Sequence, residues 1–393
     1  MPIADHTRSE LPAPSEEAQA HSDELHKHIV SLIEASGGQI SFAEFMQQAL
    51  YAPGLGYYSA GSHKLGEQGD FTTAPELSPM FSRCIASQCA PVLQELAHAD
   101  VLEVGAGSGI MAADILAELE QLNALPHAYF ILELSAELRE RQQQTIKLHV
   151  PHLYDRVRWL DALPESGFRG VVVGNELLDA MPVQRFVVEQ GAVHEVMVAI
   201  DEKEEFTWQQ GPADDALTTA VKHLEEQRGE AFADSYSSEI NLAAQAWITS
   251  VAGMLQQGLV LLIDYGFPAH EFYHEQRGMG TLMCHYRHRA HGDPFTYVGL
   301  QDITTHIDFT AMAEAADEAG LDVAGFTTQA HFLMGLGIEQ MVTADADTIK
   351  AAQQIKQLVL PSEMGELFKV IAFSRDIEIS LDGFSLQDHR NRL

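Results

Sequence analysis

The chain has 393 residues, of which 46% are hydrophobic, a length that suits one elaborated domain or a domain with subdomains. No window reaches the ~18 uninterrupted apolar residues of a membrane-spanning helix. Because 57 acidic residues outnumber 23 basic ones, the net charge of −34 argues against nucleic acid and anionic membranes as partners, and it favours a cationic partner or a role in solubility.

The first residues predict no targeting segment. Residues 1–20 are rich in Pro, Ser, Glu and Ala, which predicts a disordered tail, and they contain neither an apolar signal core nor an Arg-rich transit helix. We therefore expect a cytoplasmic protein. The three cysteines, Cys84, Cys89 and Cys284, show no paired framework and are expected to be reduced thiols.

Residues 21–98 are expected to form an N-terminal helical segment that covers a ligand. Apolar residues recur at helical spacing over residues 23–35, Ser41 and Glu44 form a capping box for a second helix, and residues 81–96 predict a third. Between them, residues 51–58 and 69–79 are rich in Gly, Pro, Tyr, Thr and acidic residues. Loops of this composition are better suited to ligand contact than to filling a core.

Residues 101–109, Val-Leu-Glu-Val-Gly-Ala-Gly-Ser-Gly, predict a strand that ends in a glycine-rich turn before a helix over residues 110–122. Turns of this kind hold nucleotide-like ligands in α/β proteins, since glycine permits tight backbone angles and close approach of the ligand. A dinucleotide fingerprint would place its third glycine at position 110, which is Ile110. This spacing weakens a nicotinamide or flavin interpretation and favours S-adenosylmethionine; a glycine turn without a ligand is the plain alternative.

Strands and helices then alternate. Strands are expected at residues 129–133, 157–160, 170–174 and 259–263, with later strands near 323–328 and 368–374 and a helix over 137–148. Short apolar runs separated by helices indicate a mostly parallel sheet with both faces covered, and ligands then bind at the carboxyl ends of the strands.

Two insertions interrupt this α/β pattern, at about 183–257 and at 265–309. Residues 183–210 alternate apolar and polar and predict an antiparallel meander, and a helix is expected over about 239–257. Residues 265–309 predict a long functional loop. The α/β domain is therefore expected to span 99–375, followed by a C-terminal tail over 376–393.

The polar residues at the expected strand ends suit an adenosine. Glu133 could accept hydrogen bonds from ribose hydroxyls, and Asp161 could accept from an adenine amino group. No Lys or Arg lies near the glycine turn in the sequence, and there is no phosphate-binding Gly-Lys-Ser/Thr loop. A sulfonium cofactor fits this set better than a nucleoside triphosphate.

The catalytic candidates follow the strand at 170–174, in the segment Asn175-Glu-Leu-Leu-Asp-Ala-Met-Pro. If this segment is helical, Glu176 and Asp179 face one side and could clamp a guanidinium, orient its nitrogen and take up its proton. The alternative is a helix N-terminus whose acidic residues complement its dipole.

One further stretch invites a metal interpretation. Residues 284–291 contain one Cys and three His, but the spacing fits no standard zinc finger and two arginines intervene, so an ordered polar lid is expected and no metal site. His306 and Asp308 are expected to belong to the same cleft, with a helix cap as the alternative for Asp308.

Several of these motifs, in this order, resemble the MidA family of S-adenosylmethionine-dependent methyltransferases, over roughly residues 25–375. The matching residues are Leu50-Tyr51, Pro53, Gly56-Tyr57-Tyr58, the run from Gly69 to Glu76, the stretch from Val101 to Gly109, Asn175-Glu176, Asp179-Ala180, Pro182, Asp264-Tyr265-Gly266 and the run from His306 to Phe309. The resemblance implies a Rossmann-like class I methyltransferase fold, with a mostly parallel seven-stranded sheet, helices on both faces, an N-terminal helical segment and an antiparallel β insertion.

The resemblance also implies roles. S-adenosyl-L-methionine would be the cofactor, and Glu176, Asp179, Asn175 and His306 would serve catalysis. The cofactor-binding residues would be Gly105, Ala106, Gly107, Glu133, Leu134, Asp161, Ala162, Asp70, Phe71, Thr72, Thr73 and Asn175. Mitochondrial members of the family are protein arginine methyltransferases that act on a respiratory complex I subunit, which implies a protein arginine as acceptor. An assembly factor with dispensable catalysis and, further off, an NAD-linked oxidoreductase are the alternatives.

Overall fold

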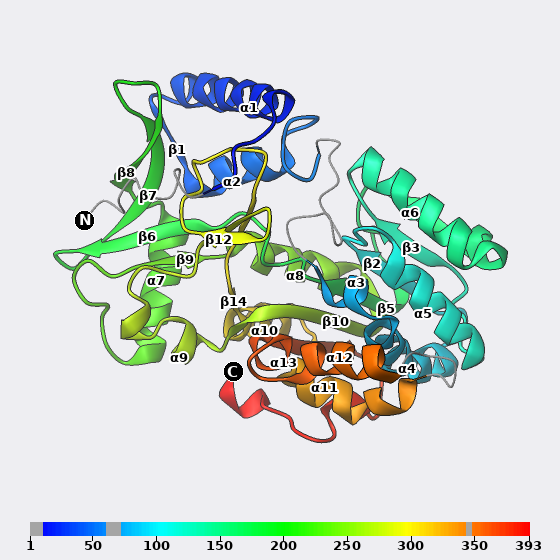
Figure 1. Ribbon diagram of the computed structural model, residues 1–393. Helices are drawn as coiled ribbons and strands as arrows, with labels where there is room; N and C mark the ends of the chain where they lie inside the picture. The colour runs from blue at the N-terminus through cyan, green and yellow to red at the C-terminus, as the bar shows by residue number, and fades with distance from the viewer. Residues whose placement is uncertain (1–10, 60–71, 343–347) are drawn as a thin grey trace. The chain divides into compact units, whose positions relative to one another are not determined.

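A computed structural model describes residues 11–59, 72–342 and 348–393, which form two compact units (Figure 1). Of the described residues, unit 1 contains 11–59, 179–244 and 269–308, and unit 2 contains 72–178, 245–268, 309–342 and 348–393. These units do not follow the expected division at residue 98. The chain leaves unit 2 twice to contribute to unit 1, at positions close to the two expected insertions.

Unit 2 is an α/β unit. Its strands are β2 (Asp100–Val104), β3 (Tyr129–Leu132), β4 (Val157–Leu160), β5 (Phe168–Asn175), β10 (Leu255–Phe267), β15 (Asp322–Thr328) and β16 (Phe368–Arg375). Its α-helices are α3 (Ala74–Leu77), α4 (Pro79–Glu95), α5 (Ile110–Gln121), α6 (Ala136–His149), α10 (Phe309–Glu318), α11 (Gln329–Gly335), α12 (Thr348–Val359) and α13 (Met364–Leu367). Short 3-10 helices are η1 (Pro151–Arg156), η3 (Ile338–Met341), η4 (Asp382–Phe384) and η5 (Arg390–Arg392).

The seven strands of unit 2 form one continuous path in the order β15-β16-β10-β5-β2-β3-β4. The five strands from β10 to β4 pair in parallel, and β16 is antiparallel to both of its neighbours. The sheet is therefore mixed: five neighbouring strands are parallel, as the alternation of strands and helices predicted, and the antiparallel orientation of β16 was not predicted.

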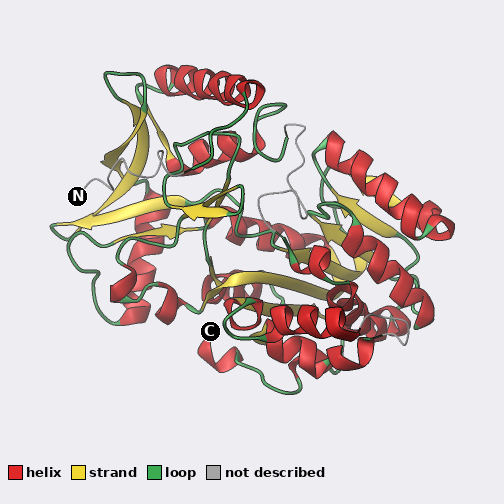
Figure 2. Ribbon diagram, in the orientation of Figure 1, coloured by secondary structure: helices red, strands yellow, loops and turns green. Residues whose placement is uncertain are grey.

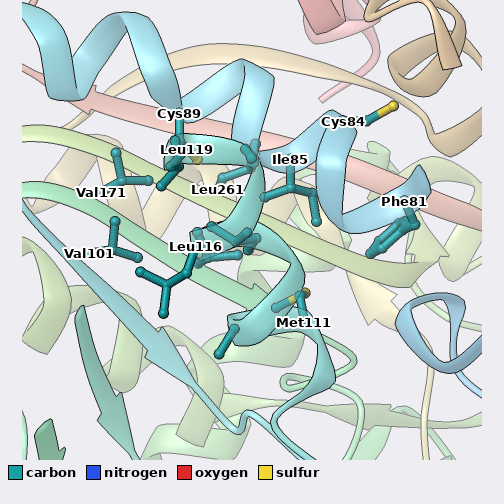
Figure 3. Packing of buried hydrophobic residues seen from close by; sticks show 14 of the residues in the cluster. Phe81, Cys84, Ile85, Cys89, Val101, Met111, Leu116, Leu119, Val171 and Leu261 are labelled. Atoms are coloured by element: carbon teal, nitrogen blue, oxygen red, sulfur yellow. The ribbon is translucent and has the colours of Figure 1, made fainter. Parts of the chain in front are cut away.

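Both faces of the central strands are buried. On one face, Val171 and Leu261 join side chains of α4 and α5, including Ile85 and Leu116, in a single apolar cluster (Figure 3). On the other face, Leu262 is 1% exposed, and α10 packs against β10 and β15. Because each strand buries both of its faces, its sequence is continuously apolar rather than alternating. Figure 2 shows the helices of unit 2 beside these strands.

Unit 1 is built on an antiparallel sheet in the order β1-β7-β6-β9, with β8 paired to β7. Its strands are β1 (Gln39–Ser41), β6 (Gln184–Glu189), β7 (Ala192–Ile200), β8 (Phe206–Pro212) and β9 (Ser237–Ile240). A second, three-stranded sheet contains β11 (Met283–Tyr286), β12 (Arg289–His291) and β13 (Asp302–Thr304), and β14 (Ile307–Asp308) follows it. Its helices are α1 (Glu16–Ala35), α2 (Phe42–Tyr51), α7 (Asp215–Arg228), α9 (Ala269–Phe272) and the 3-10 helix η2 (Glu275–Arg277). Helix α8 (Leu242–Met254) runs from unit 1 into unit 2.

Two local predictions are confirmed, the cap of α2 and the antiparallel meander. Ser41 caps α2 by accepting a hydrogen bond from the backbone N–H of Glu44 at 3.0 Å. The meander at 183–210 is present as β6, β7 and β8. In the part of the chain that the structure describes, no helix combines the length and the apolar character needed to cross a bilayer.

Three expectations were wrong in detail. Helix α1 begins at Glu16, so residues 16–20 are helical rather than part of a tail, and Ser15 caps them. Glu239 lies in strand β9 and not in the helix expected from residue 239, since its β-pairing with Arg185 defines the end of the sheet. Residues 265–309 are not a continuous loop, because Cys284 and His291 pair across a hairpin.

Candidate functional site

The parallel register brings five strand ends to one edge of the sheet in unit 2. Val104 pairs with Leu132 and Gly174, Leu132 pairs with Leu160, and Asn175 pairs with Ile263. The residues that follow these strands therefore come side by side at the carboxyl edge, where open α/β sheets bind ligands. They are Gly105, Glu133, Asp161, Glu176 and, within β10, Asp264.

The glycine turn lies between β2 and α5 and uses left-handed backbone angles at Gly105, Gly107 and Gly109, with φ of 72°, 52° and 83°. Gly109 has a second reason to be glycine, because a Cβ atom there would lie 2.9 Å from the Cα atom of Gln142. The position of this third glycine favoured S-adenosylmethionine over a dinucleotide in the sequence. In the structure, Gly109 makes room for α6. The first turn of α5 carries no acidic residue.

Glu133 is 8% exposed and already has protein partners. Its Oε1 accepts from the backbone N–H of Ser135 at 2.9 Å, and its Oε2 accepts from Nε2 of Gln142 at 3.1 Å. Burial raises the pKa of this carboxyl, while these hydrogen bonds act in the opposite direction. The next residue, Leu134, is 78% exposed and offers an apolar surface beside the carboxylate.

Arg139 of α6 is a cation at this edge that the sequence analysis missed. Its guanidinium donates at 2.6 Å to the carbonyls of Glu133 and Leu160 and to Oδ1 of Asp161. The Asp161 side chain is 90% exposed, and Ala162 beside it is exposed too. The cation therefore fixes the ends of β3 and β4 and is paired with a carboxylate.

Asp264 fixes the segment after β5. Its Oδ2 accepts from the backbone N–H groups of Leu177 and Leu178 at 3.2 and 2.9 Å, and Asp264 itself is 1% exposed. Glu176, between strand and segment, has a φ of 49°, a region that non-glycine residues rarely occupy. Its N–H donates to the carbonyl of Ile263 at 2.9 Å, and its Oε1 accepts from Nδ2 of Asn175 at 3.1 Å. Strain of this kind is concentrated at functional sites.

This geometry changes the argument for paired carboxylates. The segment after Glu176 contains no helix, so the three-residue spacing of Glu176 and Asp179 does not place them on one helical face. Glu176 belongs to unit 2 and Asp179 to unit 1. Their joint action is a prediction that rests on sequence.

In unit 1, His306 is tied to a buried ion pair. Its backbone N–H donates to Oγ1 of Thr281 at 3.1 Å, and the N–H of Thr281 donates to Oε2 of Glu239 at 2.7 Å. The other carboxylate oxygen of Glu239 is 3.1 Å from Nε of Arg185, whose guanidinium lies 4.8 Å from the Trp208 ring centroid. No sequence motif predicts this network, since its members come from distant segments.

Asp179 lies close to a tyrosine and a second carboxylate in unit 1. The Tyr58 hydroxyl donates to Oδ1 of Asp302 at 3.0 Å. Burial, and after it the charges of Asp302 and Asp179 with neighbouring tyrosines, raise the pKa of Tyr58 well above its ordinary value. Tyr58 therefore acts as a neutral hydrogen-bond donor.

The remaining predicted residues are placed only in part. Asp70 and Phe71 lie outside the described residues. Thr72 is exposed, and Thr73 is the N-cap residue of α3 in unit 2. Within residues 11–59, 72–342 and 348–393, no group of three or more His, Cys, Asp or Glu has an arrangement that could hold a metal ion.

The edge of the unit 2 sheet fits an adenosine cofactor. It offers carboxylate acceptors at Glu133 and Asp161, a glycine-rich turn, an exposed Leu134, and an arginine already paired with a carboxylate. Oδ1 of Asn175, which is 9% exposed, has no hydrogen-bond partner among the described residues. This set suits a ligand without phosphates.

Comparison with known proteins agrees with this chemistry. Residues 84–327 match the profile of Methyltransf_28, a family of S-adenosyl-L-methionine-dependent methyltransferases. The fold matches a COG1565 superfamily protein from Burkholderia thailandensis crystallised with S-adenosyl-homocysteine, with a TM-score of 0.92, 45% identity, and coverage of 98% of this chain and 100% of the other.

The chain also matches curated mitochondrial proteins. The protein arginine methyltransferase NDUFAF7 of Danio rerio is 27% identical, over 87% of this chain and 85% of its own length. Its Homo sapiens counterpart is 25% identical, over 88% and 82%.

Proposed function

The chain belongs to the Methyltransf_28 family and is an S-adenosyl-L-methionine-dependent methyltransferase, and we propose that it methylates the guanidinium group of an arginine in a protein. The observation that carries the proposal is the placement of Glu176 in a left-handed conformation at the end of β5. This position lies at the carboxyl edge of the unit 2 sheet, which we call the cofactor edge. The names of the curated relatives and the net charge of −34 support a cationic protein acceptor.

The cofactor would be held by residues of the unit 2 edge. Glu133 would accept from the ribose hydroxyls, Asp161 from the adenine amino group, and Leu134 would contact the adenine ring. The glycine turn would lie beside the ligand because its three glycines allow a close approach to the backbone. When bound, S-adenosyl-L-methionine supplies an electrophilic methyl group on a sulfonium.

Glu176 would act on the acceptor. Its carboxylate would pair with a guanidinium through charge-assisted hydrogen bonds and orient one nitrogen. The same carboxylate would accept the proton that the nitrogen releases. Asn175 would hold the Glu176 side chain through its Nδ2, and Asp179 and His306 are further candidates for contact with the acceptor. A respiratory complex I subunit, suggested by the family resemblance, is one acceptor to test.

The proposal is tested by labelled-methyl transfer in a lysate of a strain that lacks the protein, followed by mass spectrometry of the labelled site. We expect label on arginine with the wild-type protein and a loss of at least about 100-fold with Glu176→Gln, at unchanged affinity for S-adenosyl-homocysteine. Glu165→Gln, an exposed change of the same kind, is the control. Label on another residue type, or full transfer by Glu176→Gln, would contradict the proposal.

A further inference from the structure

Gln142 of α6 is fully buried and touches three parts of the cofactor edge. Its Nε2 donates to the carbonyl of Gly107 and to Oε2 of Glu133, both at 3.1 Å. Its Oε1 accepts from the indole Nε1 of Trp159, in β4, at 2.9 Å. One side chain therefore links the glycine turn, the end of β3 and the neighbouring strand.

The chemistry of these partners allows one orientation of the amide. A carbonyl and a carboxylate only accept hydrogen bonds, and an indole N–H only donates. If the amide were rotated by 180°, its oxygen would face two acceptors and its NH2 group would face a donor. Trp159, together with the two acceptors, thus sets which end of the Gln142 amide points to Glu133.

The backbone of Gln142 is as closely fitted as its side chain. A Cβ atom on Gly109 would lie 2.9 Å from the Cα atom of Gln142 and 3.1 Å from its Cβ atom. The glycine turn and α6 are consequently in direct contact, and movement at Gln142 would be transmitted to both Gly107 and Gly109.

We propose that Gln142 is a positioning residue for the cofactor, holding the Glu133 carboxylate and the glycine turn in their binding arrangement, with Trp159 fixing its amide. The inference rests on the proposed role of Glu133 toward the ribose. Both Nε2 hydrogen atoms of Gln142 are engaged with Gly107 and Glu133, so Gln142 acts on the cofactor through these neighbours.

The test uses the full chain, with S-adenosyl-homocysteine as ligand in calorimetry. Gln142→Met keeps the length of the side chain and removes both donors, and we expect its affinity to fall about tenfold or more, since a buried hydrogen bond to a charged group is lost. Gln142→Glu, which places a second carboxylate against Glu133, should lose more. Gln144→Met, an exposed change on the same helix, should bind as the wild type does.

A second readout needs no ligand. The indole N–H resonance of Trp159, assigned by its absence in Trp159→Phe, should shift in Gln142→Met and stay in place in Gln144→Met. Trp159→Phe leaves the amide intact but removes the donor to its buried oxygen, so the affinity should fall about threefold. A shifted resonance in Gln142→Met with wild-type affinity would overturn the inference, and so would wild-type affinity in Trp159→Phe if Gln142→Met does not fold.

Glu133→Gln separates this inference from the proposed function. Weakened binding by Glu133→Gln with wild-type binding by Gln142→Met would refute only the positioning role of Gln142. Wild-type binding by Glu133→Gln would refute the ribose assignment and, with it, the positioning role of Gln142, but not the proposed methylation of arginine.

Discussion

Units 1 and 2 hold their polar residues in different ways. In unit 2, Glu133 and Asp161 directly follow parallel strands, and the sheet register alone brings them to one edge. In unit 1, the buried polar contacts join segments far apart in the chain, as Arg185, Glu239 and Thr281 do. The carboxylates that follow the strands of unit 2 can thus be predicted from local sequence patterns, whereas the buried polar network of unit 1 depends on long-range contacts. Four substitutions test this difference.

The largest effect is expected from Glu239→Ala in unit 1. Glu239 is 2% exposed, and its removal leaves Arg185 without its carboxylate and the N–H of Thr281 without its acceptor. Loss of one partner of a buried ion pair costs about 3–5 kcal/mol. Chemical unfolding measures the loss, and hydrogen exchange should show it first in residues 278–306.

Glu230→Ala is the matched control for that substitution. Glu230 also pairs with an arginine, Arg228 at 3.4 Å, but its side chain is 63% exposed, so the loss should stay below about 1 kcal/mol. Equal losses in the two variants would show that the buried network of unit 1 has no special role.

Gly109→Ala breaks the contact between the glycine turn and α6. An added Cβ atom requires a left-handed alanine and meets the Gln142 backbone, so we expect a loss of about 3 kcal/mol together with weaker binding of S-adenosyl-homocysteine. Gly191→Ala has a similar φ of 76° but nothing within 4 Å, and it should lose only about 1 kcal/mol. Equal stability of the two variants would mean that α6 moves to accommodate the added Cβ atom, so that the close contact with Gln142 costs no stability.

Glu103→Gln probes a carboxyl inside the unit 2 sheet. Burial raises the pKa of Glu103 to about 7 from an ordinary 4.5, although Tyr129 donates a hydrogen bond to it. Between these pH values the folded protein keeps a proton that the unfolded chain has released. The stability therefore falls as the pH rises through this window.

The glutamine variant should have no such dependence. Unfolding measured at pH 5 and pH 8 should show Glu103→Gln to be more stable than the wild type at pH 8, by on the order of 2 kcal/mol, and nearer to it at pH 5. Glu140→Gln removes the same charge from an exposed position of α6 and should change neither value. A constant difference at both pH values would rule out the raised pKa.

The smallest effect on stability is expected from Glu176→Gly. Glycine adopts a φ of 49° without strain, so the variant should be as stable as the wild type or more stable by up to about 1 kcal/mol, while methyl transfer is lost. Gln190→Gly, at a φ of 53° in the turn between β6 and β7, should have the same stability effect and full activity. Thermal unfolding with a transfer assay checks both, and an active Glu176→Gly would refute the catalytic role.

The parts of the site that could be predicted are those that depend on neighbours in sequence. The glycine turn, Glu133 and Asp161 each follow an apolar run, and parallel pairing explains why such positions meet. Asp264 belongs to a motif visible in the sequence, but its hydrogen bonds to Leu177 and Leu178 depend on the alignment of β10 with β5. No local sequence pattern shows that a carboxylate will accept hydrogen bonds from backbone groups so far away in the chain.

Helix α6 shows the limit most clearly. Arg139 and Gln142 look like ordinary polar residues of a surface helix, yet both point to the cofactor edge. Their three-residue spacing places them near one another on the helix, but the sequence does not say which face meets the sheet. No Lys or Arg lies near the glycine turn in the sequence. In the structure, however, Arg139 of α6 reaches the same edge of the sheet, at the ends of β3 and β4.

By itself, the sequence determined the order of the parallel strands, the helices after the first two of them, the glycine turn, the carboxylates that follow the strands and the antiparallel meander, because apolar periodicity and turn residues act over a few positions. Only the tertiary structure decided that Gly109 makes room for Gln142, that Asp264 holds the segment after Glu176, and that Glu176 and Asp179 belong to different units. Contacts between distant segments depend on strand register and on the packed face of each helix, and hydrophobic pattern alone leaves both open.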